Sequence, residues 1–216
     1  KKFVGCCLVE TKFNSSAHQD TKSLFQNHSM HLAFNPGEIN NDFEGGLHGG
    51  ELIGFDSNLN FRQIDKRIID RIEAETGSFV RFAAGRVRIK NFSFLLLTLY
   101  LKCSVGMDGC NDLRMKQVSI LIKMLGLPFI IVGDFNMDSE SLLKSGWPQY
   151  LKAIPRNIGS GSSTLRFHDG RLIDFLLVSQ DMVGMVASFE LCLACPCTPH
   201  FGCEITLYGE AKAITE

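Results

Sequence analysis

Residues Leu127–Asp138 read Leu-Pro-Phe-Ile-Ile-Val-Gly-Asp-Phe-Asn-Met-Asp, and this stretch decides how the rest of the chain is interpreted. Phe129–Val132 is a short apolar run rich in β-branched residues, which predicts a buried strand. Asp134 and Asn136 follow at a spacing of two, which on an extended backbone puts both side chains on one face and Phe135 in the core. Such a polar pair is costly at the end of a buried strand without a partner, and it suits a site that holds a water, a metal or a phosphate. The alternative is a strand end at which both side chains cap backbone groups.

The length and composition predict one domain, residues 1–216. A chain of 216 residues that is 45% hydrophobic can bury one sizeable core, and no Pro-rich, Ser-rich or charged linker divides it. The formal net charge of -1 excludes a general polyanion binder, so any contact with nucleic acid needs a local basic patch. The most basic region contains Arg62, Lys66, Arg67, Arg71, Arg81, Arg86, Arg88 and Lys90. These residues are equally well interpreted as solvated charges on edge strands.

We expect no membrane segment and an intracellular location, the nucleus included. Phe92–Leu101, the longest apolar run, is too short to cross a bilayer and is broken by Ser93 and Thr98. The first ten residues lack the long apolar region and cleavage site of a signal peptide. The chain also lacks an initiator Met, which favours a processed chain or a fragment of a longer polypeptide. We expect a monomeric domain.

The eight cysteines favour a reducing compartment in the absence of a signal sequence. A cluster near the C-terminus is formed by Cys192, Cys195, Cys197 and Cys203, with His200 among them. Their spacing does not match the two Cys-x2-Cys pairs of a closed zinc site. We therefore interpret them as small buried hydrophobic residues rather than as zinc ligands.

Strand and helix patterns alternate along the chain. Strands are expected at Phe3–Val9, Met30–Phe34, Glu51–Phe55, Arg86–Lys90, Phe92–Leu101, Thr164–Phe167, Arg171–Val178, Val183–Leu193 and Cys203–Tyr208. Helices are expected at Ala17–His28 with Leu24 and Phe25 inward, from Asn111 or Asp112 through Leu125, and at Ser139–Lys144. Phe61–Glu75 is either a short helix or a loop that leads into a strand. The glycine-rich stretch Glu44–Phe55 lacks the Gly-Lys-Ser/Thr of a phosphate-binding loop. It therefore predicts a loop that leads into a strand, with glycines that allow close packing against the sheet.

Two further carboxylates, Glu10 and Asp174, are site candidates because of their positions. Glu10 stands at the carboxyl end of a predicted strand, and Tyr100 stands near the end of another. Asp174 lies in the middle of the apolar run Arg171–Val178, where a carboxylate needs a partner or becomes neutral. His200 precedes the last predicted strand. His48 could reach a ligand from its glycine-rich loop, although an exposed loop histidine is the simpler interpretation.

The order of these features resembles that of the endonuclease/exonuclease/phosphatase superfamily, which includes deoxyribonuclease-I-like enzymes, abasic-site endonucleases and the endonuclease domains of non-LTR retrotransposons. The resemblance covers nearly the whole chain. It rests on Glu10-Thr-Lys, Tyr100, Gly133-Asp-Phe-Asn136, Leu172-Ile-Asp174-Phe and Pro199-His200. The fold that it implies is an α/β sandwich of two mixed β-sheets packed face to face, with flanking helices and without the family's first strand.

The resemblance also implies a role for each site residue. Glu10 would ligate Mg²⁺, with Mn²⁺ as an alternative, and Asp134 would orient or deprotonate the attacking water. Asn136 would hold a phosphate oxygen, and Tyr100 would donate a hydrogen bond to the scissile phosphate. His200 would stabilise or protonate developing charge, with Asp174 fixing its ring. Metal, activated water and neutralised phosphate charge are what phosphodiester hydrolysis requires.

The sequence departs from the family pattern at three places. Pro199 stands where the family has an Asp before the His, Cys103 stands where many relatives have an Asn, and the upstream Asn of the first strand is not present. The leading expectation is a Mg²⁺-dependent DNA endonuclease of retroelement or repair type. A phosphatase for phosphoinositides or other small phosphoesters is an alternative. A degenerate binding domain of the same fold is the third, favoured by Pro199.

Overall fold

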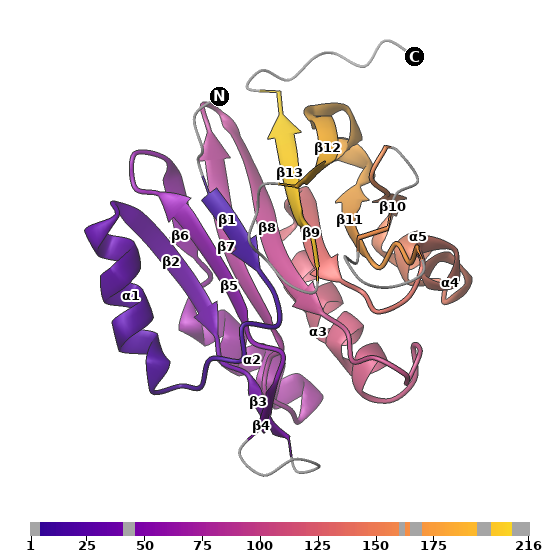
Figure 1. Cartoon of the computed structure of the whole chain (residues 1–216), viewed down its shortest axis with the longest axis horizontal. Helices are drawn as coiled ribbons and strands as arrows, with labels where there is room; N and C mark the ends of the chain where they lie inside the picture. The colour runs from indigo at the N-terminus through magenta and orange to yellow at the C-terminus, as the bar shows by residue number, and fades with distance from the viewer. Residues whose placement is uncertain (1–4, 41–45, 160–162, 165–169, 194–199, 209–216) are drawn as a thin grey trace.

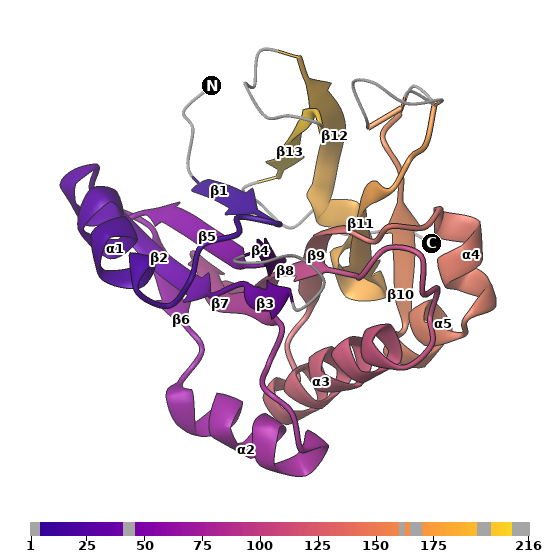
Figure 2. The same cartoon turned by 60° about the horizontal axis from the view of Figure 1, so that its bottom comes forward.

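A computed structural model of the chain describes residues 5–40, 46–159, 163–164, 170–193 and 200–208 (Figure 1). Its elements form two β layers with helices outside them, which confirms the predicted sandwich. In Figure 2, β1, β2 and β5 lie with β12 and β13 on one side of the larger sheet, and α2 and α3 lie on its other side. Among the described residues, no helix is long and apolar enough to cross a membrane.

The larger layer is a six-stranded sheet in the order β10-β11-β9-β8-β7-β6. Its strands are β6 (Asn60–Gln63), β7 (Phe82–Ile89), β8 (Phe92–Tyr100), β9 (Phe129–Asp134), β10 (Ala153–Arg156) and β11 (Asp174–Ser179). Strands β8 and β9 pair in parallel, whereas the other neighbours in this sheet are antiparallel. The parallel pair is connected by α3 (Cys110–Leu125), the helix expected between the strands predicted at Phe92–Leu101 and Phe129–Val132.

The second layer consists of antiparallel pieces in the described part of the chain. Strand β5 (Glu51–Asp56) lies between β1 (Gly5–Leu8) and β2 (Met30–Asn35), and β12 (Val186–Cys192) pairs with β13 (Gly202–Leu207). A small hairpin is formed by β3 (Glu38–Asn40) and β4 (Gly46–His48). The remaining elements are α1 (Ala17–Asn27), α2 (Lys66–Thr76), α4 (Ser139–Lys144), α5 (Trp147–Leu151) and the 3-10 helix η1 (Gln180–Met185).

Aromatic stacking ties the two layers together. Phe55 of β5 stacks on Phe61 of β6 with ring centroids 5.4 Å apart. Phe61 lies against Gly85 of β7, where an added Cβ would come within 2.1 Å of the Phe61 ring. Burial of aromatic rings contributes several kcal/mol to a core of this size. Because the Phe61 ring lies this close to the backbone of β7, position 85 requires a glycine.

Most predicted elements are confirmed to within a few residues, and the ambiguous segment Phe61–Glu75 contains both β6 and α2. Gly126 ends α3 in the left-handed conformation, with φ of 58°. Asn111 does not cap α3, because it lies inside the first turn and its amide bonds the backbone of Lys102 and Gly106. Leu24 was expected to face inward but is 56% exposed.

Two predicted strands begin in a different place. Val183–Leu193 starts inside η1, and only β12 is extended. Asp174 is the first residue of β11 rather than its middle, so the carboxylate lies at the end of an interior strand. The predicted strand Thr164–Phe167 lies largely outside the described residues.

The close packing around Gly133 predicts that a side chain at this position destabilises the protein. A Cβ at Gly133 would lie 2.5 Å from the Leu99 carbonyl oxygen of β8. Because backbone cannot move aside as a flexible side chain can, Gly133→Ala should lower the free energy of unfolding by about 1–3 kcal/mol in urea denaturation. Gly159→Ala is the control, since no atom lies within 4 Å of its added Cβ. Equal effects of both substitutions would contradict this constraint.

Candidate active site

The register of three neighbouring strands builds the centre of the site. Tyr100 at the end of β8 pairs with Asp134 at the end of β9, and Asp134 pairs with Asp174 at the start of β11. Paired residues on adjacent strands point to the same face of a sheet. The Asp134 carboxylate is 2% exposed, so it is held in a nearly dry environment between its two neighbours.

Asn136 reaches Asp134 by a turn and not by an extended strand. Strand β9 ends at Asp134, and Asn136 has a φ of 50°, the left-handed conformation that Asn tolerates. The Asn136 backbone N–H donates to Asp134 Oδ1 at 2.9 Å, and its Nδ2 donates to Asp134 Oδ2 at 3.2 Å and to the Leu101 carbonyl at 2.8 Å. The predicted neighbours are confirmed, but a turn brings them together. Phe135 is fully buried as predicted and stacks on Phe175 with centroids 4.1 Å apart.

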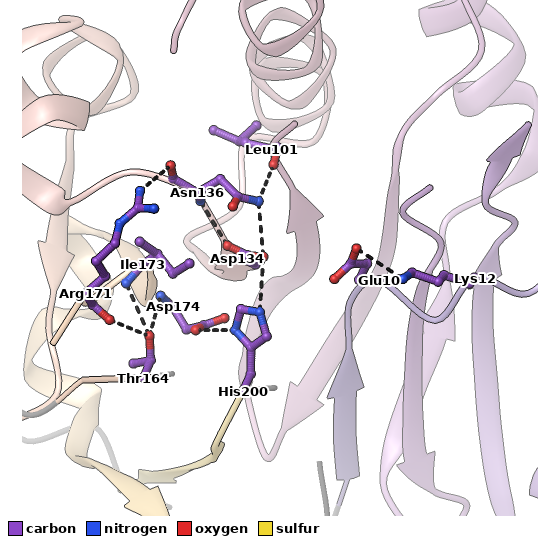
Figure 3. Close-up of polar contacts among 10 residues, drawn as sticks. All are labelled: Glu10, Lys12, Leu101, Asp134, Asn136, Thr164, Arg171, Ile173, Asp174 and His200. Atoms are coloured by element: carbon purple, nitrogen blue, oxygen red, sulfur yellow. Dashed lines mark hydrogen bonds and ion pairs between the residues drawn. The ribbon is translucent and has the colours of Figure 1, made fainter. Parts of the chain in front are cut away.

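His200 lies between the two aspartates (Figure 3). Its Nδ1 is 2.7 Å from Asp174 Oδ2, and its Nε2 is 3.8 Å from Asp134 Oδ2. A carboxylate at Nδ1 accepts that N–H and fixes the ring, leaving Nε2 directed to the centre of the site. The Thr164 hydroxyl oxygen accepts from the backbone N–H groups of Ile173 and Asp174, which anchors the start of β11.

Glu10 comes from the other β layer on an unusual turn. Glu10 and Lys12 have φ of 54° and 55°, and the backbone N–H groups of Thr11 and Lys12 donate to the carbonyls of Gly50 and Gly49 at 3.0 and 2.9 Å. Left-handed conformations cost energy for residues with a side chain, so the two glycine carbonyls hold this turn in place. Lys12 Nζ lies 3.7 Å from Glu10 Oε1 (Figure 3).

Glu10, Asp134 and His200 form a donor set that could hold a cation. One ligand atom from each lies within 4.8 Å of the others. Two carboxylates suit Mg²⁺ or Mn²⁺, which prefer oxygen ligands, and an imidazole is also acceptable to Mn²⁺. The chemistry of the donors therefore fits the divalent metal that the sequence suggested.

Burial and mutual repulsion perturb the titration of the site. Burial, and secondly the Asp174 carboxylate, raise the pKa of Asp134 from 3.8 to about 7. The hydrogen bond with Asp174 raises the pKa of His200 above its ordinary value, against the opposing effect of burial. Burial, followed by the negative charges of Glu10 and Asp134, raises the pKa of Tyr100. The site thus holds a carboxyl group that is a usable base near neutral pH beside an imidazole that tends to stay protonated.

All six predicted site residues lie in this region. Glu10, Asp134 and His200 come together, Asn136 and Asp174 bond to members of that set, and the ring of Tyr100 is buried at their edge. Pro199, Cys195 and Cys197 lie outside the described residues, as does the side chain of His48.

The sequence did not point to three groups that support the site. Thr164 anchors β11, and Arg114 donates to the Tyr100 carbonyl at 2.5 Å with its guanidinium 5.8 Å from the Tyr100 ring. Glu51, 2% exposed, accepts from Asn35 at 2.7 Å next to the two glycines. An Arg within an amphipathic helix pattern and a Glu that opens a strand were the available signals, because such residues are rarely buried without a role.

Comparisons with known proteins bear on the fold of this chain. No protein-family model matches the sequence, and no curated protein sequence matches it. Solved structures do match. The endonuclease domain of TRAS1, a telomere-specific non-LTR retrotransposon, is 12% identical, with 93% of this chain and 97% of that chain covered and a TM-score of 0.60. The mannosyl-6-phosphatase Bt3783 of Bacteroides thetaiotaomicron is 15% identical, with 95% and 85% covered and a TM-score of 0.60.

A third solved structure has the same fold. The catalytic domain of human Nocturnin is 18% identical, with 82% of this chain and 69% of that chain covered and a TM-score of 0.55. These matches confirm the resemblance at the level of fold: the chain has the deoxyribonuclease-I-like fold of the endonuclease/exonuclease/phosphatase superfamily.

The raised pKa of Asp134 predicts that this carboxylate destabilises the metal-free protein at alkaline pH. Between pH 3.8 and about 7 the unfolded chain loses this proton before the folded one does, so stability falls as the pH rises through that window. Asp134→Asn should therefore raise the free energy of unfolding at pH 8 in EDTA by about 1–3 kcal/mol. At about pH 3, where this carboxyl group is mostly protonated in both the folded and the unfolded chain, the two proteins should differ little. A less stable variant at pH 8 would contradict the assignment.

The Asp174–His200 hydrogen bond predicts a shift in the titration of His200. Because this bond is the main cause of the raised pKa, Asp174→Asn should lower the pKa of His200, as followed by NMR of the imidazole ring in EDTA. His31 provides an internal reference in the same spectra. An unchanged pKa of His200 would show that Asp174 does not hold the ring in solution.

Proposed function

We propose that this protein is a divalent-metal-dependent phosphodiester hydrolase that cleaves DNA. The observation that carries the proposal is the convergence of Glu10, Asp134 and His200, from both β layers, with Asn136 and Asp174 bonded behind them. A buried base, an oriented imidazole and a cation site within one short span are the groups that hydrolysis of a phosphoester needs.

Glu10 would hold Mg²⁺ or Mn²⁺, and Asp134 and His200 lie close enough to share it. When bound, such an ion supplies positive charge that polarises a phosphate oxygen and neutralises charge in the transition state. Lys12 beside Glu10 adds a fixed positive charge at the edge of the same site.

Asp134 is the proposed base. With a pKa of about 7 it can accept the proton of a water molecule at neutral pH while that oxygen forms its bond to phosphorus. As the bond from phosphorus to the leaving oxygen breaks, protonated His200 supplies positive charge, or its Nε2 proton, to the developing oxyanion. Asp174 keeps that ring oriented and protonated.

Asn136 has a more specific role than the sequence suggested. Its Nδ2 group already donates to both Asp134 and Leu101, which orients the base. A contact from this amide to a phosphate oxygen would have to replace one of these two bonds. We therefore assign to Asn136 the positioning of Asp134, with phosphate contact only after such an exchange, and to Tyr100 a hydrogen bond to the phosphate.

DNA is favoured as the substrate because cations flank the site although the chain is slightly acidic overall. Arg171 Nη2 donates to the Asn136 carbonyl at 3.5 Å, and Lys12 lies across the site from it (Figure 3). Two separated cations suit the successive phosphates of a polynucleotide. The TRAS1 domain, which has the same fold, is an endonuclease by its description.

A phosphatase for small phosphoesters is the second candidate. The net charge of -1 favours it, because a small substrate needs no extended basic surface. One matching structure is a mannosyl-6-phosphatase by its description. The catalytic groups would be unchanged, and only the leaving group would differ.

Nicking of supercoiled plasmid with Mg²⁺, Mn²⁺ or EDTA tests the proposal. We expect metal-dependent nicking that falls by about 10²-fold or more in Asp134→Ala and His200→Ala, since each removes a proton-transfer group. Asp181→Ala, an exposed carboxylate in η1, is the matched control and should keep full activity.

Absence of nicking by the parent protein would reject the DNA endonuclease. A panel of phosphomonoesters would then test the second candidate with the same variants. Metal binding measured by calorimetry, with loss in Glu10→Gln, separates an inactive but metal-binding domain from one that holds no metal.

A further inference from the structure

A hollow of about 200 Å³ lies over strands β6 and β7, where α2 begins and α3 ends. Its polar walls include Arg62 and Arg86, and its apolar walls are Ile64, Ile68, Leu125 and Leu127. The hollow therefore combines two guanidinium groups with an apolar surface, a composition typical of sites for small organic anions.

The two arginines are placed against each other by the sheet. Arg62 of β6 and Arg86 of β7 are directly paired in the antiparallel register, so both side chains leave the same face. Like charges at directly opposite positions repel, and neither arginine lies within ion-pair distance of a carboxylate in the described part of the chain. A bound anion would remove this repulsion.

Neighbouring groups leave the hollow positively charged. The only carboxylate in its wall, Asp65, accepts from the Arg67 backbone N–H at 2.8 Å as the N-cap of α2. Arg86 Nη2 donates to the Ser93 hydroxyl at 3.2 Å, which holds one guanidinium in place. Two positive charges, of which Arg86 is held by Ser93, against one carboxylate that already caps the helix favour an anion with a charge of two.

This hollow is separate from the active site. Arg86 pairs with Leu95 of β8, and the unbroken alternation along β8 puts Leu95 and Tyr100 on opposite faces. Arg62 and Arg86 therefore lie on the helix-covered face of the six-stranded sheet, whereas Asp134 lies on the other face with Tyr100. A ligand in the hollow cannot be the substrate that Asp134 and His200 act on.

We propose that this hollow is a binding site for a small phosphomonoester that carries an apolar group. The phosphate dianion contacts Arg62 and Arg86 through paired N–H groups, and the apolar group lies against Ile64, Ile68 and the end of α3. The proposal concerns binding only, and it does not depend on the proposed nuclease activity.

The test is an NMR titration of the whole 216-residue chain in EDTA with phenyl phosphate and, in parallel, with inorganic phosphate. We expect saturable shifts of the backbone amides around Gln63, Gly85 and Leu127. Phenyl phosphate should bind about tenfold more tightly, because its ring removes apolar wall from water. In Arg62→Gln/Arg86→Gln the affinity at these amides should fall by at least about tenfold.

Arg88→Gln is the matched control. Arg88 lies on the same strand and the same face as Arg86, but it donates to the Lys90 carbonyl and does not line the hollow. It should bind like the parent, and thermal unfolding checks that all variants are folded. The proposal is overturned by an unchanged affinity in the double variant, by an equal loss in Arg88→Gln, or by shifts confined to residues around Asp134. The affinities of the double variant and of Arg88→Gln at the hollow do not bear on plasmid nicking, which tests the other face, so the two proposals can fail separately.

Discussion

The register of β8, β9 and β11 is the constraint on which the rest of the site depends. It aligns Tyr100, Asp134 and Asp174 in one row across the sheet, and a slip of one residue would turn the carboxylates to the helix-covered face. The close approach of Gly133 to the Leu99 carbonyl is part of this register, since only a residue without a side chain permits it. The stacked rings of Phe135 and Phe175 also hold the end of β9 against the start of β11.

Folding alone would not favour a negatively charged group at the position of Asp134. Asp134 is almost fully buried beside Asp174, and its backbone and amide bonds to Asn136 offset only part of the cost. A buried carboxylate that titrates near pH 7 is unfavourable for stability and useful for proton transfer. The Asp174–His200 hydrogen bond is likewise more useful for the site than for stability, because it orients one ring and does not fill the hydrophobic core.

The sequence predicted the fold, and the residues of the candidate site, better than it predicted the geometry of that site. The apolar run before Gly133 and the helix that ends at Gly126 are local patterns, so both were predictable. The candidate site residues were predicted from their order along the chain. The left-handed turn at Asn136 could not be read from residue types, because Asn also occurs in extended strands. The anchoring by Thr164 could not be predicted either, since it depends on contacts between segments distant in sequence.

Glu10 reaches the site from a layer that Asp134 does not share with it. Its strand β1 pairs with β5 alone among the described strands, and its turn is held by two carbonyls, those of Gly49 and Gly50. Such an edge opens more easily than the centre of a sheet. The geometry of the donor set formed by Glu10, Asp134 and His200 therefore depends on the alignment of the two layers. Local opening of β1 would separate Glu10 from the other two residues while the six-stranded sheet remained folded.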